Sequence, residues 1–187
     1  MAQMIDVAPE GWWAMASPDS FFPEDLPEDW QLTYYANAFS SVVVPAAHWT
    51  GQSAQTLAGW RDDVNPGFRF YLGQPQPADP DQLERAAAAL DDALAGFVQP
   101  PLTSGQDAAT ALLEARSAGA RRRIGSVLRC PSALNLDLRG ARDWLRARVN
   151  RAPGEHWLLI VEQPTADELR GWRDLLVLMG LASGNAE

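Results

Sequence analysis

Short apolar runs alternate along the chain with segments of helical periodicity, and this alternation restricts the possible folds more than any other feature. We expect strands at 4–8, 41–44, 68–72, 124–129 and 157–161. The run at 41–44 is short and rich in valine, which is typical of a strand buried on both faces. Strands that alternate with helices indicate an α/β fold with a mostly parallel sheet.

The segments between these runs have the spacing of amphipathic helices. We expect helices at 28–39, 53–63, 80–97 and 105–118, and two more that begin after Asp137 and Thr165. The clearest is 80–97, with Asp79 as its N-cap, Pro80 at its first position and an apolar stripe that continues to Phe97. Thr165 and Glu168 have the spacing of a capping box.

The length of the chain limits how much of a barrel it can build. A closed barrel of eight strand–helix units typically needs about 250 residues, and this chain has 187. We therefore expect one α/β domain over 1–187, with an incomplete TIM-barrel-like (β/α) fold of about five to six mostly parallel strands. The last residues, 182–187, are expected to be a frayed tail.

Charge and composition disfavour several classes of protein. The net charge is −9, and an acidic chain has few cations with which to neutralise nucleic-acid phosphates. No apolar run is long enough to span a membrane, and no leader pattern begins the chain, so a cytoplasmic location is expected. With one cysteine and two histidines, a disulfide or a closed structural zinc site is not expected. No phosphate-loop or dinucleotide motif is present, so no cofactor is expected.

A resemblance to a known family is carried mainly by residues 21–42. Phe21-Phe22-Pro23 is followed by Glu24-Asp25-Leu26-Pro27, and then by Trp30-Gln31-Leu32-Thr33-Tyr34-Tyr35-Ala36. These segments resemble the F-Y-P, E-x-L-P and W-L-x-Y-Y-A motifs of the domain-of-unknown-function 72 family, also called YecE-like. Phe68-Arg69-Phe70 looks like its F-R-F strand. The resemblance implies a (β/α) barrel.

The same comparison implies that polar groups of the family are missing at the strand ends. Val43-Val44-Pro45 stands where the family has E-I-N, Gly73 where it has lysine, and Val127 and Cys130 where it has Glu and His. Polar residues at these ends carry the chemistry of such barrels. The resemblance therefore indicates a shortened, degenerate member of the family. We interpret it as a non-catalytic binding or interaction module.

Three residues keep an enzymatic alternative open, a small-molecule hydrolase or isomerase that acts on an anionic substrate. Glu162 follows the strand at 157–161 and is either a general base or a solvated acid beside a helix N-terminus. Arg129 either binds a ligand carboxylate or phosphate, or pairs with Glu162 or Asp6. His48 follows the strand at 41–44 and either faces a pocket or is an ordinary loop residue.

Four further residues are candidates for ligand contact. Trp12 and Trp49 follow the first two strands, and they either form a stacking platform for a sugar or base, plug an incomplete barrel, or make a subunit contact. Asp6 alternates with apolar neighbours, so it faces the opposite side of its strand and needs a partner, for which an arginine is the obvious candidate. Gln163 follows Glu162 directly.

The expected partners of the protein are a second copy of the chain and a small ligand. An incomplete barrel leaves a sheet edge open, and a second copy of the chain would cover it, so we expect a homodimer. A small anionic ligand is the other expected partner. Cys130 is expected to be a plain buried thiol, because no cysteine–histidine signature surrounds it.

Overall fold

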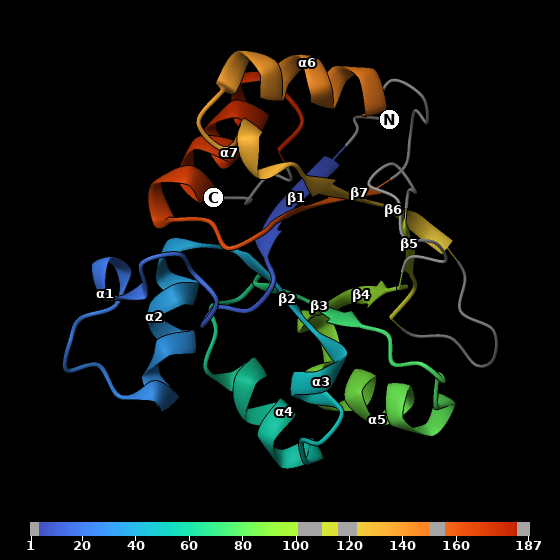
Figure 1. Ribbon diagram of the computed structural model, residues 1–187. Helices are drawn as coiled ribbons and strands as arrows, with labels where there is room; N and C mark the ends of the chain where they lie inside the picture. The colour runs from blue at the N-terminus through green and yellow to red at the C-terminus, as the bar shows by residue number, and fades with distance from the viewer. Residues whose placement is uncertain (1–3, 101–109, 116–122, 150–155, 183–187) are drawn as a thin grey trace.

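The computed structural model describes residues 4–100, 110–115, 123–149 and 156–182, and within them one sheet runs through the molecule (Figure 1). Its strands follow the order β1-β7-β6-β5-β4-β3-β2. Their bounds are β1 (Met4–Pro9), β2 (Ser41–Val44), β3 (Arg69–Gly73), β4 (Leu94–Val98), β5 (Thr110–Leu113), β6 (Arg123–Cys130) and β7 (His156–Val161). Neighbouring strands are parallel except where β5 pairs antiparallel with β4 and β6.

The strands at the two ends of this order, β1 and β2, lie next to each other, so the sheet nearly closes into a barrel. Glu10 and Val43 form a parallel bridge, and the Gly11 N–H donates to the Val43 carbonyl at 2.7 Å. The Ser41 hydroxyl donates to the Val7 carbonyl at 2.9 Å. The expected TIM-barrel-like α/β fold is confirmed, with seven strands in the described residues instead of five or six.

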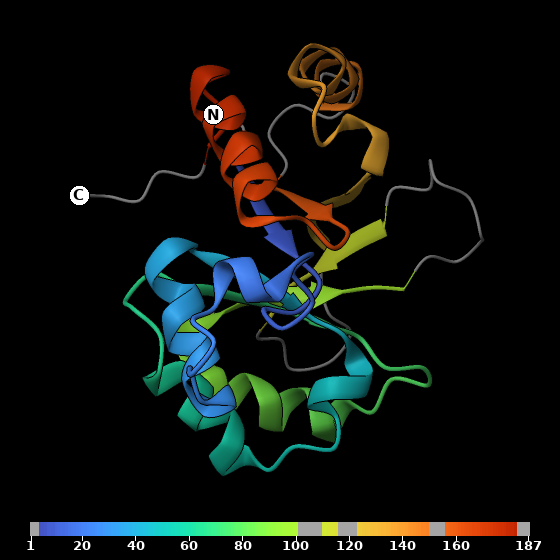
Figure 2. The same ribbon diagram turned by 60° about the vertical axis from the view of Figure 1, so that its left-hand side comes forward.

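Helices surround the sheet on its outer side (Figures 1 and 2). The α-helices are α1 (Pro18–Phe21), α2 (Gln31–Ala38), α3 (Ala46–Trp49), α4 (Ala54–Asp62), α5 (Pro80–Leu90), α6 (Leu138–Val149) and α7 (Ala166–Leu178). Three short 3₁₀ turns are η1 (Glu28–Trp30), η2 (Asp91–Ala93) and η3 (Ser132–Leu134). The capping box that opens α7 is confirmed, since Thr165 and Glu168 bond each other's backbone N–H groups.

The helix expected over 80–97 is wrong beyond Leu90. At Asp91 the backbone has a positive φ of 50°, which ends the helix, and the chain then forms η2 and the strand β4. The spacing of Leu94 and Phe97 continues the helical stripe, which is why the sequence pattern extended the helix. Gly96 allows the strand to form, because a Cβ there would lie 2.7 Å from the Leu113 carbonyl of β5.

The helix expected over 105–118 is also wrong where the structure describes that segment. Thr110–Leu113 is the strand β5, while 101–109 and 116–122 lie outside the described residues. The segment is rich in alanine and leucine, which favour helices. Burial of Leu112 inside the barrel overrides this local preference. Of the expected frayed tail, 183–187 also lies outside the described residues, and Ala182 bridges to Ile5.

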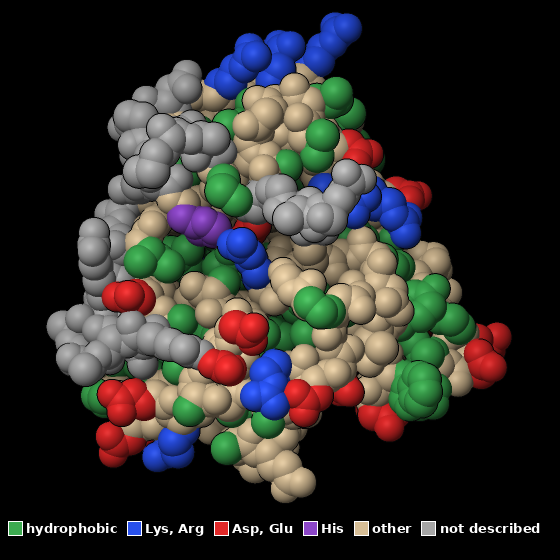
Figure 3. Space-filling view, turned by 180° about the vertical axis from the view of Figure 1, so that it is seen from behind, with side chains coloured by type: hydrophobic (Ala, Val, Ile, Leu, Met, Phe, Trp, Pro, Cys, Tyr) green, Lys and Arg blue, Asp and Glu red, His purple; other side chains and the backbone are tan. Residues whose placement is uncertain are grey.

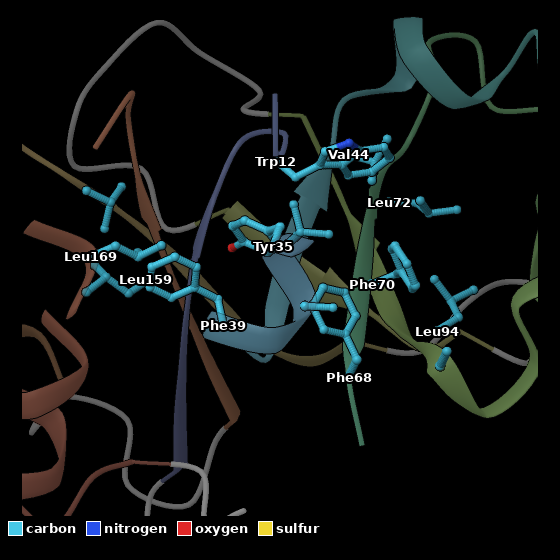
Figure 4. Close-up of a cluster of buried hydrophobic side chains, with 14 of the residues drawn as sticks. Trp12, Tyr35, Phe39, Val44, Phe68, Phe70, Leu72, Leu94, Leu159 and Leu169 are labelled. Carbon is cyan, nitrogen blue, oxygen red and sulfur yellow. The ribbon is translucent and has the colours of Figure 1, made fainter. Parts of the chain in front are cut away.

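Two hydrophobic cores lie on the two faces of the sheet. The outer core packs the sheet against the helices and holds most of the aromatic rings, among them Trp12, Tyr35, Phe39, Phe68 and Phe70 (Figure 4). The inner core fills the barrel with Ala8, Val43, Tyr71, Val98, Leu112, Val127, Leu158 and Ile160. The barrel is therefore packed with side chains, and polar groups are confined to its two ends.

The close approach of β6 and β7 gives a test of the sheet. A Cβ on Gly125 of β6 would collide with the His156 carbonyl of β7. We expect Gly125→Ala to lower the free energy of unfolding by about 2–3 kcal/mol, measured by urea denaturation. The control is Gly59→Ala in α4, where an added methyl meets nothing within 4 Å. The control should raise the free energy of unfolding by about 0.5–1 kcal/mol, and equal effects of the two substitutions would contradict the close approach.

Candidate functional site

Three charged residues lie where strands of the barrel end, and we call this group the mouth. They are Glu10, Arg129 and Glu162. Each continues the inward alternation of the strand that it belongs to or directly follows. The residues two positions earlier, Ala8, Val127 and Ile160, belong to the inner core. Strands β1, β7 and β6 are neighbours in parallel register, so their C-terminal ends bring these side chains together.

Arg129 lies between the two carboxylates of the mouth but is held unequally by them. Its Nη2 donates to Glu10 Oε1 at 2.8 Å. Its Nη1 is 3.7 Å from Glu162 Oε1, too long for a hydrogen bond. The side chains of Arg129 and Glu10 are 35% and 33% exposed, and that of Glu162 is 59% exposed. The mouth therefore has one firm ion pair and one loose, solvated neighbour.

His48 does not join this group by any polar contact of its side chain in the described residues. It lies on α3, with its ring centroid 4.6 Å from that of Trp13. Of the three residues expected for the enzymatic alternative, the structure brings Arg129 and Glu162 together.

The candidate ligand-contact residues near the mouth differ in the solvent exposure of their side chains. Trp12 and Trp49 are 8% and 1% exposed, so almost none of either ring is open to solvent. Trp12 packs edge-on against Trp60, and the Trp49 N–H donates to the Gly73 carbonyl at 2.8 Å. Gln163 is exposed and has a left-handed backbone, with φ of 41°.

The strand-end positions that lack the family's polar groups are now part of the packing. Val43 and Val127 are buried in the inner core. A Cβ on Gly73 would lie 3.0 Å from the Ala46 backbone nitrogen, so a longer side chain has little room there. Cys130 is buried, and its Sγ lies 3.4 Å from Asn135 Oδ1.

A second polar cluster lies at the opposite end of the barrel, which we call the base. It consists of Asp6, Arg69, Tyr71 and His156. Asp6 Oδ2 accepts hydrogen bonds from the Tyr71 hydroxyl and, at 3.3 Å, from Arg69 Nη1. His156 Nε2 lies 2.9 Å from the Tyr71 oxygen and 3.3 Å from Asp6 Oδ2. The expected arginine partner of Asp6 is thus Arg69.

Burial and charge at the base alter the pKa values of two of its members. Burial first, and then the charge and hydrogen bond of Asp6, raise the pKa of Tyr71 well above its ordinary value. Burial alone would lower the pKa of Arg69, but the charges and hydrogen bonds of Asp6 and Tyr71 together outweigh burial and raise it. Tyr71 therefore stays a hydroxyl donor, and Arg69 stays a cation.

The sequence missed Tyr71 and His156 as members of this cluster. Tyr71 lies between Phe70 and Leu72, so its inward orientation follows from the same alternation that orients Asp6. His156 starts a strand, at the end of the barrel where catalytic groups are not expected. The alternation of side chains along each strand indicates which residues face inward. The order of the strands is also needed to show which inward residues meet.

The environment of Cys130 gives a test of its chemistry. Burial first, and then the charges of Glu162 and Glu168, raise the pKa of Cys130 to about 12. Because the thiolate is the reactive form, we expect the folded protein to react with a disulfide reagent such as dithionitrobenzoate at least tenfold more slowly at neutral pH than the urea-unfolded chain. Rapid labelling of one thiol per folded chain would show that Cys130 is accessible and ionised.

Comparison with known proteins confirms the family resemblance of the sequence. The family model described as "Protein of unknown function DUF72" matches residues 7–125, more than half of the chain. No curated protein and no solved structure matches the chain. The match begins within β1, includes the four strands β2 to β5 in full and ends within β6. The chain therefore belongs to the DUF72 family of proteins of unknown function.

Proposed function

We propose that this protein is a non-catalytic binding module that takes a small anionic ligand at the mouth of its barrel. The observation that carries the proposal is the unequal hold on Arg129, with one guanidinium nitrogen fixed by Glu10 and another facing a loose contact. Glu10 orients the guanidinium, and a ligand carboxylate or phosphate would replace Glu162 at Nη1. Arginine suits such a ligand because its planar group forms paired hydrogen bonds with oxyanions.

The inner core limits how such a ligand binds. Below the mouth lie Ala8, Val127 and Ile160, which are 0–2% exposed. A polar ligand gains nothing by entering this apolar packing, since its hydrogen bonds to water would be lost. The proposed ligand is therefore held at the rim, where Arg129 and Glu162 are partly exposed.

The enzymatic alternative requires more than the mouth provides. A hydrolase or isomerase would need His48 to reach the reacting atoms together with Glu162 and Arg129. His48 instead packs its ring against Trp13. Arg129 lies next to Glu162, the group that the alternative assigns as general base. These contacts favour binding without a chemical step.

Self-association and location belong to the same proposal. The near-closure of the sheet between β1 and β2 removes most of the open edge that suggested a homodimer. Two neighbouring apolar side chains on α7 are nevertheless well exposed, Val177 at 60% and Leu178 at 86%. We propose that a second copy covers them. In the described ranges no helix is long and apolar enough to cross a membrane, and the free, buried Cys130 fits a cytoplasmic location.

The anion proposal is tested with malonate as the probe, by following backbone amide signals in two-dimensional NMR. We expect the signals of Gly11, Cys130 and Gln163 to shift. Arg129→Gln should weaken binding at least tenfold, a loss of about 1.4 kcal/mol. Glu162→Gln should strengthen it severalfold, because a competing negative charge is removed. Arg142→Gln on α6 is the matched control, since Arg142 is exposed and pairs with Asp143 instead.

Two results would contradict this proposal. One is the absence of malonate-dependent shifts at the mouth. The other is turnover of p-nitrophenyl acetate or p-nitrophenyl phosphate that Glu162→Gln and His48→Asn both abolish, which would establish the hydrolase alternative.

The proposed homodimer has its own test, because it rests on a different surface. Light scattering after size-exclusion chromatography should give about twice the chain mass of 20.5 kDa. Leu178→Glu should return the protein to a monomer, while Arg170→Glu nearer the start of α7 should not. A monomeric mass for the unsubstituted protein at high concentration would rule out the homodimer.

A further inference from the structure

A pocket of about 410 Å³ opens at the base of the barrel, far from the mouth. Its polar lining residues are Arg69 from β3, His156 from β7 and Asp92 from η2. The remaining lining residues are Gly67, Phe68, Ala95 and Ile124. Figure 3 shows a histidine beside an arginine on the corresponding face, with acidic side chains nearby. The proposed function at the mouth makes no use of this pocket.

Behind the pocket lies a carboxylate that fixes both polar groups. Asp6 is only 7% exposed, and its Oδ2 lies 3.3 Å from Arg69 Nη1 and 3.3 Å from His156 Nε2. The two side chains that reach the pocket are therefore neighbours around one oxygen atom. A buried carboxylate with such partners has a defined position, because losing them would leave an uncompensated charge.

The hydrogen bonds at the base determine where His156 carries its proton. Tyr71 has a single hydroxyl hydrogen and donates it to Asp6. The contact of 2.9 Å between the Tyr71 oxygen and His156 Nε2 therefore requires the imidazole to donate. With its hydrogen on Nε2, the neutral ring has a lone pair on Nδ1. In the part of the chain that the structure describes, Nδ1 has no hydrogen-bond partner, and the side chain is 23% exposed.

Arg69 provides the complementary group. Its guanidinium has five N–H donors, and the contact with Asp6 is made through Nη1. The side chain is 39% exposed and lines the pocket. The pocket thus combines a cationic donor, Arg69, with a hydrogen-bond acceptor, Nδ1 of His156.

We propose that this pocket binds a small oxyanion that also carries a hydroxyl group, such as a hydrogen phosphate or a hydroxy acid. The oxyanion accepts hydrogen bonds from Arg69, and its hydroxyl donates to Nδ1 of His156. A plain oxyanion such as sulfate satisfies only the arginine. Asp92 at the rim opposes the binding of negative charge, which keeps the affinity modest.

The test compares ligands of similar shape with and without a donor hydroxyl. Phosphate is compared with sulfate, and lactate with propionate, by two-dimensional NMR at near-neutral pH. We expect the amide signals of Gly67, Ala95 and Ile124 to shift with both members of a pair. The hydroxyl-bearing member should cause the shifts at concentrations at least tenfold lower than the other member. If only phosphate, or only lactate, binds better than the other member of its pair, the result identifies which of the two chemical classes the pocket takes. Signals at the mouth report separately, so failure of one site does not affect the other.

Substitutions assign the two interactions. Arg69→Gln should weaken phosphate binding at least tenfold, and His156→Phe should remove the preference for phosphate over sulfate. Asp92→Asn should strengthen binding two- to fivefold. Arg142→Gln is again the control and should leave binding unchanged. Because Arg69 and His156 contact the buried Asp6, their variants are used only if the amide spectrum shows a folded protein. If those variants do not fold, the test rests on Asp92→Asn, because Asp92 is exposed.

The proposal is overturned by any of three results. These are the absence of shifts around the pocket with both phosphate and lactate, equal binding of the paired ligands, and an unchanged affinity in Asp92→Asn.

Discussion

The buried carboxylate of Asp6 is the interaction on which the arrangement of the barrel base depends. Removing a carboxylate from water costs several kcal/mol unless partners compensate it. Asp6 obtains those partners from β7, which pairs with β1, and from β3, which lies beyond β2 on the other side of β1 once the sheet has nearly closed. Between β1 and β2 the described residues pair through the bridge at Glu10 and Val43, its backbone hydrogen bond, and the hydrogen bond from the Ser41 hydroxyl to the Val7 carbonyl. Asp6 adds a link between β1 and β3 across this junction.

The alternation of side chains along the strands explains why polar groups gather at both ends. Inward positions at the middle of the barrel are aliphatic, with Tyr71 as the exception that reaches Asp6. Polar side chains in the middle would lack partners, because the side chains around them are buried and apolar. At the ends they meet solvent and one another. The result is two separate polar groups, the mouth and the base, divided by an apolar layer.

Much of this could be predicted from the sequence, and the failures have local causes. Five strands and the parallel α/β class followed from β-branched runs and helical spacing. The strands β4 and β5 were missed because Leu94 and Phe97 fit a helical stripe and because alanine and leucine around Leu112 favour a helix. Burial in a sheet overrides both preferences, and burial depends on the rest of the chain.

The candidate site shows the same limit. Alternation alone predicts that Asp6 faces the side opposite Ile5 and Val7 and, if that side is the barrel interior, needs a partner, for which an arginine is the obvious candidate. It did not identify Arg69 and Tyr71, which are 63 and 65 positions away, because strand order and register are set by contacts between distant segments. Arg129 was expected near a strand end, but its pairing with Glu10 depends on β1 and β6 lying on either side of β7.

The two ends of the barrel hold an arginine in a comparable way. Arg129 is fixed by Glu10 at the mouth, and Arg69 is fixed by Asp6 at the base, each with other nitrogens available. In a chain with a net charge of −9, a bound anion meets long-range repulsion that salt only partly screens. A carboxylate that holds each arginine in place reduces the side-chain entropy lost on binding, but it also offsets the positive charge. Affinity for anions then depends on geometry more than on net attraction, so the neighbouring group at each end, Glu162 or His156, determines which ligand is preferred.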